Sequence, residues 1–314
     1  MQSGVLQVDQ RLLGAIEAGG TKFNCALADM QGNVLAKAAF PTTTPVETLT
    51  AVRDFFNDAV SARGATLAAI GIASFGPVEL NRRAPNYGFI TKTPKAGWSE
   101  TDICGYFRAA FQVPVAFETD VNGAAWGELI AGAAQGCRHF IYVTVGTGIG
   151  AGIVINGQLL QGVTHPEVGH MLMPRELLVD SYQGCCPFHV GCLEGLASGT
   201  AIAQRWGVNG KHLADDHPAW DLEAHYLAAM CVNLTQCFSP QKIILGGGVM
   251  EKTLLFPLIR RKFLELINGY APESVLTQID QYIVPTGLAG QAGIVGALDL
   301  AMQQLNAQDS SLRT

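Results

Sequence analysis

The chain has 314 residues, of which 48% are hydrophobic and 36 are glycine, so it holds enough apolar side chains for two ordinary cores. Its formal net charge is −6 and its Lys and Arg residues are not clustered, which argues against a nucleic-acid partner and favours a small solute. The starting segment, MQSGVLQVDQRLL, lacks the pattern of a signal peptide, and no long apolar run predicts a membrane span. We therefore expect a cytoplasmic protein with no membrane partner. Its thiols are expected to be reduced, and five that are scattered through apolar segments are expected to be buried: Cys25, Cys104, Cys137, Cys231 and Cys237.

The first part of the chain predicts an α/β domain. Residues 12–40 predict three strands, separated by glycine turns in AGGT and MQGN. An amphipathic helix is expected from about Pro45 to Arg63, with Thr44 as its N-cap. A buried strand follows in AAIGIASFG, and a further strand, VPVAFETD, leads directly into the helix NGAAWGELIAGAAQG. This last junction is a plausible domain boundary.

The opening pattern then returns in HFIYVTVGTGIGAGIVINGQLLQG, which again reads as strand, glycine turn, strand, tight turn and strand. We interpret this as an internal duplication. Both copies place a glycine-rich turn, EAGGTK or VGTGIG, between paired strands, where consecutive backbone N–H groups can face an anion. Both turns are therefore candidate phosphate sites, and the alternative is that they are hairpin turns with no ligand.

A third glycine run, KIILGGGVM, follows an apolar strand and precedes a helix that is expected from about Lys252. Its glycines would let a ribose or a flat ring approach the backbone, although a tight strand-to-helix turn is the simpler alternative. A dinucleotide-binding fold built on GTGIGAG is disfavoured, because that fingerprint must open a helix and here it leads into IVING.

Asp120 is expected at the end of a strand, immediately before a helix. Phosphoryl transfer to a hydroxyl needs a carboxylate that accepts the proton of the attacking group, and Asp120 is the best-placed candidate. Capping of the following helix is the alternative role.

The segment 167–194 gathers histidines and cysteines. Cys186, His189 and Cys192 follow a Cx₂Hx₂C spacing, and His170 is far enough upstream to complete a tetrahedral Zn²⁺ site, although Cys185 is an alternative ligand to Cys186. Four protein ligands leave no open position for catalysis, so this predicts a structural metal. A DNA-binding zinc finger is disfavoured, because the segment has few basic residues.

Two glutamates flank these proposed ligands. Glu167 lies three residues before His170, and Glu194 lies two residues after Cys192. A metal that fixes this loop would also fix both carboxylates, and preordered acceptors bind sugar hydroxyls better than mobile ones. The alternative is that both glutamates are simply solvated.

Taken together, these segments resemble the ROK family of sugar kinases over essentially the whole chain. The segments that carry the resemblance are EAGGTK, TDVNGAAWGE, VGTGIGAG, EVGH and GCLEG. Several others are most similar to the bacterial zinc-containing fructokinase branch: SFGPVEL, NYGFITKTPKAGW, HPEVGH and CPFHVGCLEGLASG. The resemblance implies an actin-like (ribonuclease H-like) duplicated α/β ATPase fold with two domains flanking a cleft. The implied domains are residues 1–121, with the helix 292–314 packing back on them, and residues 122–291.

The resemblance also implies an activity, which is ATP-dependent phosphorylation of a hexose at its primary 6-hydroxyl by a homodimer that uses Mg²⁺. Fructose is the expected hexose; mannose, glucose, an amino sugar, or a non-catalytic sugar-binding regulator are the alternatives. Asp120 would be the general base. The residues expected to bind ATP are Gly19, Gly20, Thr21, Lys22, Thr144, Gly146, Thr147, Gly148, Gly246, Gly247, Gly248, Val249 and Met250. The residues expected to bind the sugar are Gly76, Pro77, Asp120, Glu167, His170 and Glu194.

Four positions depart from the broader family. His189 stands among the expected metal ligands where the family at large tends to use cysteine. Thr119 precedes Asp120 where glucose-using members commonly carry Asn, which favours fructose over glucose. Glu17 opens the first glycine loop where many members carry Asp. His165 stands against the expected sugar wall, in HPEVGH.

Overall fold

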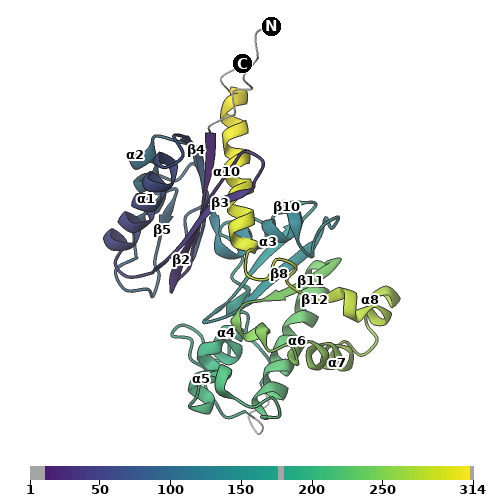
Figure 1. Cartoon of the computed structure of the whole chain (residues 1–314). Helices are drawn as coiled ribbons and strands as arrows, with labels where there is room; N and C mark the ends of the chain where they lie inside the picture. The colour runs from purple at the N-terminus through teal and green to yellow at the C-terminus, as the bar shows by residue number, and fades with distance from the viewer. Residues whose placement is uncertain (1–10, 176–179, 312–314) are drawn as a thin grey trace. The chain divides into compact units, whose positions relative to one another are not determined.

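The computed structural model describes residues 11–175 and 180–311 (Figure 1). Most of the starting segment, the end of the expected C-terminal helix (312–314) and part of the expected zinc loop (176–179) lie outside these residues. The chain divides into two compact units. Unit 1 comprises residues up to Gly127 together with those from Gly293 onward, and unit 2 comprises Glu128–Ala292. None of the helices in the described ranges has the length and apolar character needed to cross a membrane.

Unit 1 is built on a five-stranded sheet with the order β3-β2-β1-β4-β7. Strand β2 pairs antiparallel with β1 and β3, whereas β1, β4 and β7 are parallel. Its elements are β1 (Arg11–Ala18), β2 (Lys22–Ala28), β3 (Val34–Pro41), α1 (Pro45–Ser61), β4 (Thr66–Ser74), β5 (Phe89–Ile90), β6 (Thr101–Asp102), α2 (Ile103–Phe111), β7 (Val115–Thr119), α3 (Asp120–Ala131, which continues into unit 2) and α10 (Ala292–Ser311).

Unit 2 contains a second sheet with the order β10-β9-β8-β11-β12 and the same pattern of antiparallel and parallel pairs. The predicted duplication is therefore confirmed. Its elements are β8 (Phe140–Val145), β9 (Ile149–Ile155), β10 (Gln158–Leu159), η1 (Val168–His170), α4 (Leu193–Ala197), α5 (Gly199–Trp206), η2 (Gly210–His212), α6 (Ala219–Phe238), β11 (Lys242–Gly246), η3 (Gly248–Glu251), α7 (Leu255–Ile267), α8 (Glu273–Thr277), α9 (Ile279–Tyr282) and β12 (Ile283–Pro285).

The sheet of unit 1 is buried on both faces, as the alternation along β1 requires. Leu12 and Ile16 pack into the core formed with α1 and α2, whereas Leu13 and Ala15 pack against α10. Figure 1 shows α10 running along the sheet, with α1 and α2 on its other side. The predicted start of α1 is confirmed, because Thr44 forms a capping box.

Helix α10 approaches β4 and α3 closely because glycines at the facing positions carry no side chain. A Cβ atom on Gly71 of β4 would lie 1.8 Å from the carbonyl oxygen of Ala297. Where α10 meets α3, a Cβ atom on Gly296 would lie 1.8 Å from the carbonyl oxygen of Gly123. These contacts hold α10 directly against the helix that begins at Asp120.

We expect Gly71→Ala to destabilise the protein by about 1 to 3 kcal/mol, because the added methyl group meets backbone atoms of α10 and the helix must move. Chemical denaturation of the whole chain, monitored by a spectroscopic probe on α10, measures this loss of stability. Gly162→Ala is the control, since the nearest atom to its added Cβ would lie 3.7 Å away. An unchanged midpoint for Gly71→Ala would contradict the described packing of α10.

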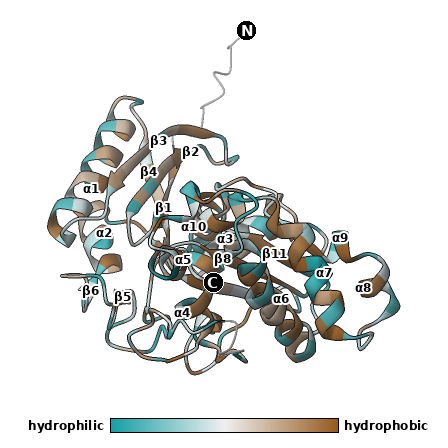
Figure 2. Cartoon of the chain, turned by 90° about the horizontal axis from the view of Figure 1, so that it is seen from below, coloured by the Kyte–Doolittle hydropathy of each residue, from teal (hydrophilic) through white to brown (hydrophobic). Residues whose placement is uncertain are grey.

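In unit 2, the strands β8, β9 and β11 share one core with helices α4 to α7. Figure 2 shows both hydrophilic and hydrophobic residues on α7, and its buried residues recur at helical spacing: Leu255, Phe256, Ile259, Phe263 and Ile267. Helix α6 was not predicted from the sequence, and α7 begins about three residues later than predicted, because η3 intervenes.

Two of the expected buried cysteines are not buried. Cys237 is exposed and Cys137 is only half-buried, whereas Cys25, Cys104 and Cys231 are buried as expected. Cys237 lies in the last turn of α6, where the helix leaves the core, and Cys137 lies in the connection before β8. Apolar neighbours in the sequence therefore do not by themselves predict that a cysteine is buried.

Glu128, in the WGE part of the segment around Asp120, has a structural role that the sequence analysis missed. Its buried carboxylate accepts the N–H groups of Ala133 at 2.7 Å, Gly287 at 3.0 Å and Leu288 at 3.2 Å, as well as the hydroxyl of Thr286. It thus ties the end of α3 to the segment that follows β12.

Candidate active site

Asp120 is the first residue of α3 and not, as expected, the last residue of the preceding strand. Its Oδ1 accepts the N–H of Val121 at 2.9 Å. The hydroxyl of Thr119, which is buried, accepts the N–H of Asn122 at 3.1 Å. Thr119 therefore caps the first turn of α3 with its hydroxyl. Helix capping was the alternative role considered for Asp120.

The first glycine loop joins β1 to β2 in unit 1. The N–H of Gly19 donates to the carbonyl of Lys22 at 3.0 Å, and the hydroxyl of Thr42 donates to the carbonyl of Gly19 at 2.7 Å. Gly20, Thr21 and Lys22 are exposed at the tip of the turn. The loop is thus tightly held while its tip remains accessible.

Glu17 lies behind this loop. Its Oε2 accepts the side-chain amide of Asn24 at 2.8 Å, and a Cβ atom on Gly293 would lie 2.6 Å from its Oε1. Burial raises the pKa of the Glu17 carboxyl, although Asn24 and Lys22 act in the opposite direction. A larger residue at 293 would therefore displace Glu17 from the start of α10.

The second and third glycine loops meet within unit 2. The N–H of Gly199, at the start of α5, donates to the carbonyl of Gly146 at 2.7 Å, and the hydroxyl of Thr200 donates to the carbonyl of Thr147 at the same distance. Gly247 has a φ of +89°, and a Cβ atom on it would lie 2.5 Å from the carbonyl oxygen of Val145. Only glycine fits this close backbone approach.

A pocket of about 990 Å³ opens where these segments meet. Gly146, Thr147, Gly248 and Val249 line it, so the structure brings together four of the residues expected to bind ATP. The neighbouring expected residues lie beside the pocket and outside its lining: Thr144, Gly148, Gly246, Gly247 and Met250. The pocket combines exposed backbone with polar side chains and is large enough for a nucleotide.

The far wall of this pocket was not predicted from the sequence. It is supplied by α5, η2 and the short connection from η3 to α7. Lys252 donates to Asp215 Oδ1 at 2.8 Å and to the carbonyl of Leu213 at 3.1 Å, and its Nζ lies 5.3 Å from the centre of the Trp220 ring. Lys211 lines the same wall. None of these residues lies in a glycine motif, so no signal in the sequence joined them to the loops.

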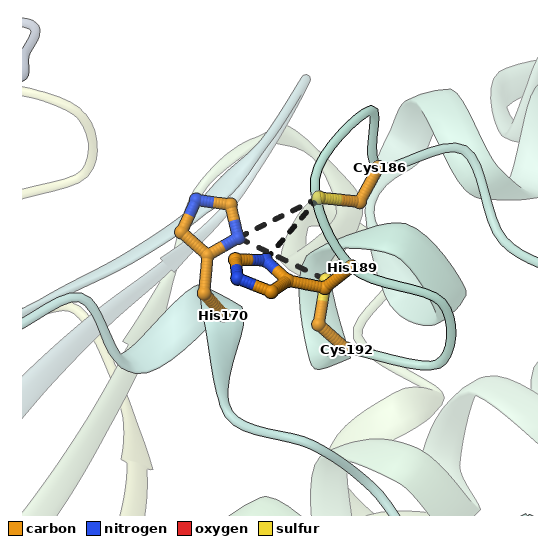
Figure 3. Close-up of side chains that lie close together, drawn as sticks. All are labelled: His170, Cys186, His189 and Cys192. Atoms are coloured by element: carbon orange, nitrogen blue, oxygen red, sulfur yellow. Dashed lines mark hydrogen bonds between the residues drawn. The ribbon is translucent and has the colours of Figure 1, made fainter.

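Figure 3 shows the four side chains of the expected metal site pointing toward one another. The ligand atoms of His170, Cys186, His189 and Cys192 all lie within 4.8 Å of one another. His170 Nδ1 is 3.7 Å from Cys186 Sγ and 3.8 Å from Cys192 Sγ. Cys185 lies outside this cluster, with its Sγ 3.9 Å from Ser198 Oγ, so Cys186 is the better-placed thiol.

Two thiols and two imidazoles at these separations fit a tetrahedral structural Zn²⁺ site. Burial raises the pKa of the Cys192 thiol to about 11. This thiol is therefore protonated at neutral pH in the metal-free chain, and Zn²⁺, which binds the thiolate, would displace its proton. Backbone pairing of Leu172 with Cys192 holds the two sides of the cluster together.

Glu194 connects the metal cluster to the second glycine loop. It lies in the first turn of α4, which Cys192 caps by accepting the N–H of Gly195 at 3.4 Å. Its Oε2 accepts the N–H of Ile149 at 2.9 Å, immediately after Gly148. The alternative of a freely solvated Glu194 is therefore wrong.

The remaining expected sugar-binding residues fall in both units. Glu167 is half-exposed, and its Oε1 lies 2.9 Å from His165 Nε2. Gly76 and Pro77 follow β4 in unit 1 and are joined by a cis peptide bond. Unit 1 thus carries Gly76, Pro77 and Asp120, while unit 2 carries Glu167, His170 and Glu194.

A protein-family model described as the ROK family matches residues 13–304. The chain belongs to the ROK family. A fructokinase from Pediococcus pentosaceus is 48% identical to it, over 94% of this chain and 99% of that protein. A fructokinase from Zymomonas mobilis is 44% identical, over 95% and 99% of the two chains.

The solved structure of a ROK family glucokinase from Streptomyces griseus, in complex with glucose and AMPPNP, is also similar. It has a TM-score of 0.73 and 28% identity, over 93% of this chain and 99% of that one. With the repeated sheet order, this likeness confirms the predicted actin-like ROK fold.

Proposed function

We propose that the protein is a fructokinase, which transfers the γ-phosphoryl group of ATP to the primary 6-hydroxyl of fructose. The observation that carries this proposal is the 48% identity to a fructokinase over nearly the full length of both chains. The pocket at the glycine loops supports nucleotide binding, and the position of Asp120 at a helix start supports its role as base.

In the proposed reaction, fructose binds with its 6-hydroxyl facing the Asp120 carboxylate. The hydroxyl oxygen attacks the γ-phosphorus, a new O–P bond forms, and the bond to the β-phosphate oxygen breaks. The hydroxyl proton passes to Asp120, and ADP leaves. ATP enters as its Mg²⁺ complex, and backbone N–H groups of the glycine loops contribute to binding its phosphates.

Zinc has a structural role in this proposal. His170, Cys186, His189 and Cys192 would hold it, and it would fix the segments that carry Glu167 and Glu194. The hydrogen bond from Ile149 already orients Glu194, and His165 pairs with Glu167. Both carboxylates would then accept sugar hydroxyls without a large loss of side-chain entropy.

A coupled assay of ADP release with a panel of hexoses tests the activity. Hexose-dependent ADP release is the expected result. Sugar binding without ADP release would instead favour the non-catalytic regulator.

We expect kcat/KM to be higher for fructose than for glucose by about ten- to a hundredfold, the effect of one lost polar contact of about 1 to 3 kcal/mol. Thr119→Asn should raise the relative activity on glucose. The variant should fold, because Asn also caps helices and can replace the Thr119 hydroxyl at Asn122. Kinetics with fructose, mannose and glucose at one concentration of ATP and Mg²⁺ measure both effects. A preference for glucose in the unmodified protein would contradict the choice of fructose and leave the kinase proposal standing.

The homodimer that the family resemblance implies, and the cytoplasmic location, stay predictions. Analytical ultracentrifugation of the zinc-loaded protein tests the first.

A further inference from the structure

A buried ion pair attaches the beginning of the metal loop, residues 180–192, to helix α5. The Asp180 side chain is 4% exposed and that of Arg205 is 7% exposed. Arg205 donates to the Asp180 carboxylate through Nε at 3.2 Å and through its terminal nitrogen at 3.0 Å. The hydroxyl of Tyr226, on α6, donates to the same carboxylate at 2.6 Å. A buried bidentate pair of this kind fixes the relative geometry of its two segments.

Further contacts join the same two segments. The Tyr182 hydroxyl donates to Gln204 Oε1 at 3.0 Å, and the Arg205 guanidinium lies 4.6 Å from the centre of the Tyr182 ring. On α6, the buried carboxyl of Glu223 has no hydrogen-bond partner among the described residues and interacts electrostatically with Arg205. Burial raises the pKa of Glu223 well above its usual value, so Asp180 supplies the carboxylate that neutralises Arg205.

The other side of α5 forms a wall of the nucleotide pocket. Its first residues, Gly199 and Thr200, hydrogen-bond the carbonyls of the second glycine loop, and Gln204 lines the pocket. Gln204 therefore contacts the metal loop and the pocket at once. The helix has eight residues and is only about 12 Å long, so a shift at Arg205 moves its whole length.

We propose that Arg205 is a positioning residue that couples occupancy of the metal site to nucleotide affinity, an inference that rests on the proposed function. A bound metal fixes the loop from Cys186 to Cys192, the loop fixes Asp180 and Tyr182, and these hold α5 with Thr200 and Gln204 at the pocket. Loss of the metal frees the loop and loosens that wall. Because binding couplings are reciprocal, a bound nucleotide must tighten metal binding by the same factor.

The zinc-loaded full chain tests this coupling. The equilibrium zinc affinity is measured by competition with a chromophoric chelator, with and without saturating ADP. We expect ADP to tighten zinc binding by about fivefold or more. We call the ratio of the zinc affinities with and without ADP the coupling factor. In Arg205→Lys this coupling factor should fall toward one, because an ammonium group cannot form the bidentate pair with Asp180. The same ADP concentration is used throughout, so zinc bound directly by ADP cancels between proteins.

Arg260→Lys is the matched control. Arg260 pairs with Asp280 at 2.8 Å in the same unit and donates to the carbonyl of Ile283, on segments other than α5 and the metal loop, so this variant should keep the full coupling factor. A second variant, Tyr182→Phe, removes only the hydroxyl that reaches Gln204 and should lower the factor even if Arg205→Lys does not fold.

The outcomes separate the two proposals. Calorimetry first measures ADP binding to the unmodified protein, and a failure to bind would overturn the nucleotide pocket and the proposed function. ADP binding that leaves zinc affinity unchanged would overturn the coupling alone. An unreduced factor in Tyr182→Phe and in folded Arg205→Lys would overturn the role of α5.

Discussion

Asp120→Asn is expected to lower kcat by about 10²- to 10⁴-fold, because the amide keeps the size of the side chain but cannot accept the proton of the attacking hydroxyl. The amide oxygen can still accept the N–H of Val121, and Thr119 still caps α3, so the fold should persist. Steady-state kinetics with fructose and ATP measure the loss.

Nucleotide affinity should change little in Asp120→Asn, because Asp120 is not among the residues that line the pocket at the second and third glycine loops. Asp102→Asn is the matched control. Asp102 caps α2 by accepting the N–H of Gly105 at 2.6 Å, and its replacement should leave kcat unchanged. Near-normal kcat in Asp120→Asn would remove Asp120 from the mechanism.

Cys192→Ala is expected to abolish metal retention. The unmodified protein should hold about one zinc per chain, because the donor set suits tetrahedral Zn²⁺. Without Cys192 the site has three ligands, and α4 loses the sulfur that accepts the N–H of Gly195. Elemental analysis of gently purified protein measures the zinc, and calorimetry measures the accompanying loss of fructose affinity.

Cys185→Ala is the control, because it removes a neighbouring thiol that is not one of the four proposed ligands. Cys185 is adjacent to Cys186 in sequence but lies outside the cluster, so its removal should leave the zinc content intact. Full zinc content in Cys192→Ala would show that Cys192 is not a required ligand. Loss of zinc with full sugar affinity would show that the metal does not fix the sugar-binding carboxylates.

The sequence predicted those parts of the fold that depend on local pattern. Alternating strands and glycine turns revealed the duplication, and the Cx₂Hx₂C spacing identified side chains that the structure brings together. The wall of the nucleotide pocket was not predictable in this way. Lys211, in η2, and Lys252, in the connection from η3 to α7, both line it, and no short sequence motif indicates that segments so far apart in the chain meet at one pocket.

The role of Glu128 was missed for the same reason. It belongs to a recognisable motif, but its partners at 286–288 come more than 150 residues later, as the sequence separation of 158 to Thr286 shows. Its burial thus depends on tertiary contacts that follow only from the complete unit. The exposure of Cys237 was missed for a related reason: its sequence neighbours are apolar, but it lies at the end of α6, where the helix faces solvent.

The docking of α10 on unit 1 has a consequence for biosynthesis. The strands of unit 1 are translated first, all of unit 2 follows, and only then does α10 become available to cover Leu13, Ala15 and Ala69. Unit 2, which is one continuous stretch, can close its core on the ribosome before this happens. We therefore expect unit 1 to mature last although its first strands emerge earliest, with an apolar sheet face that a chaperone can bind in the interval.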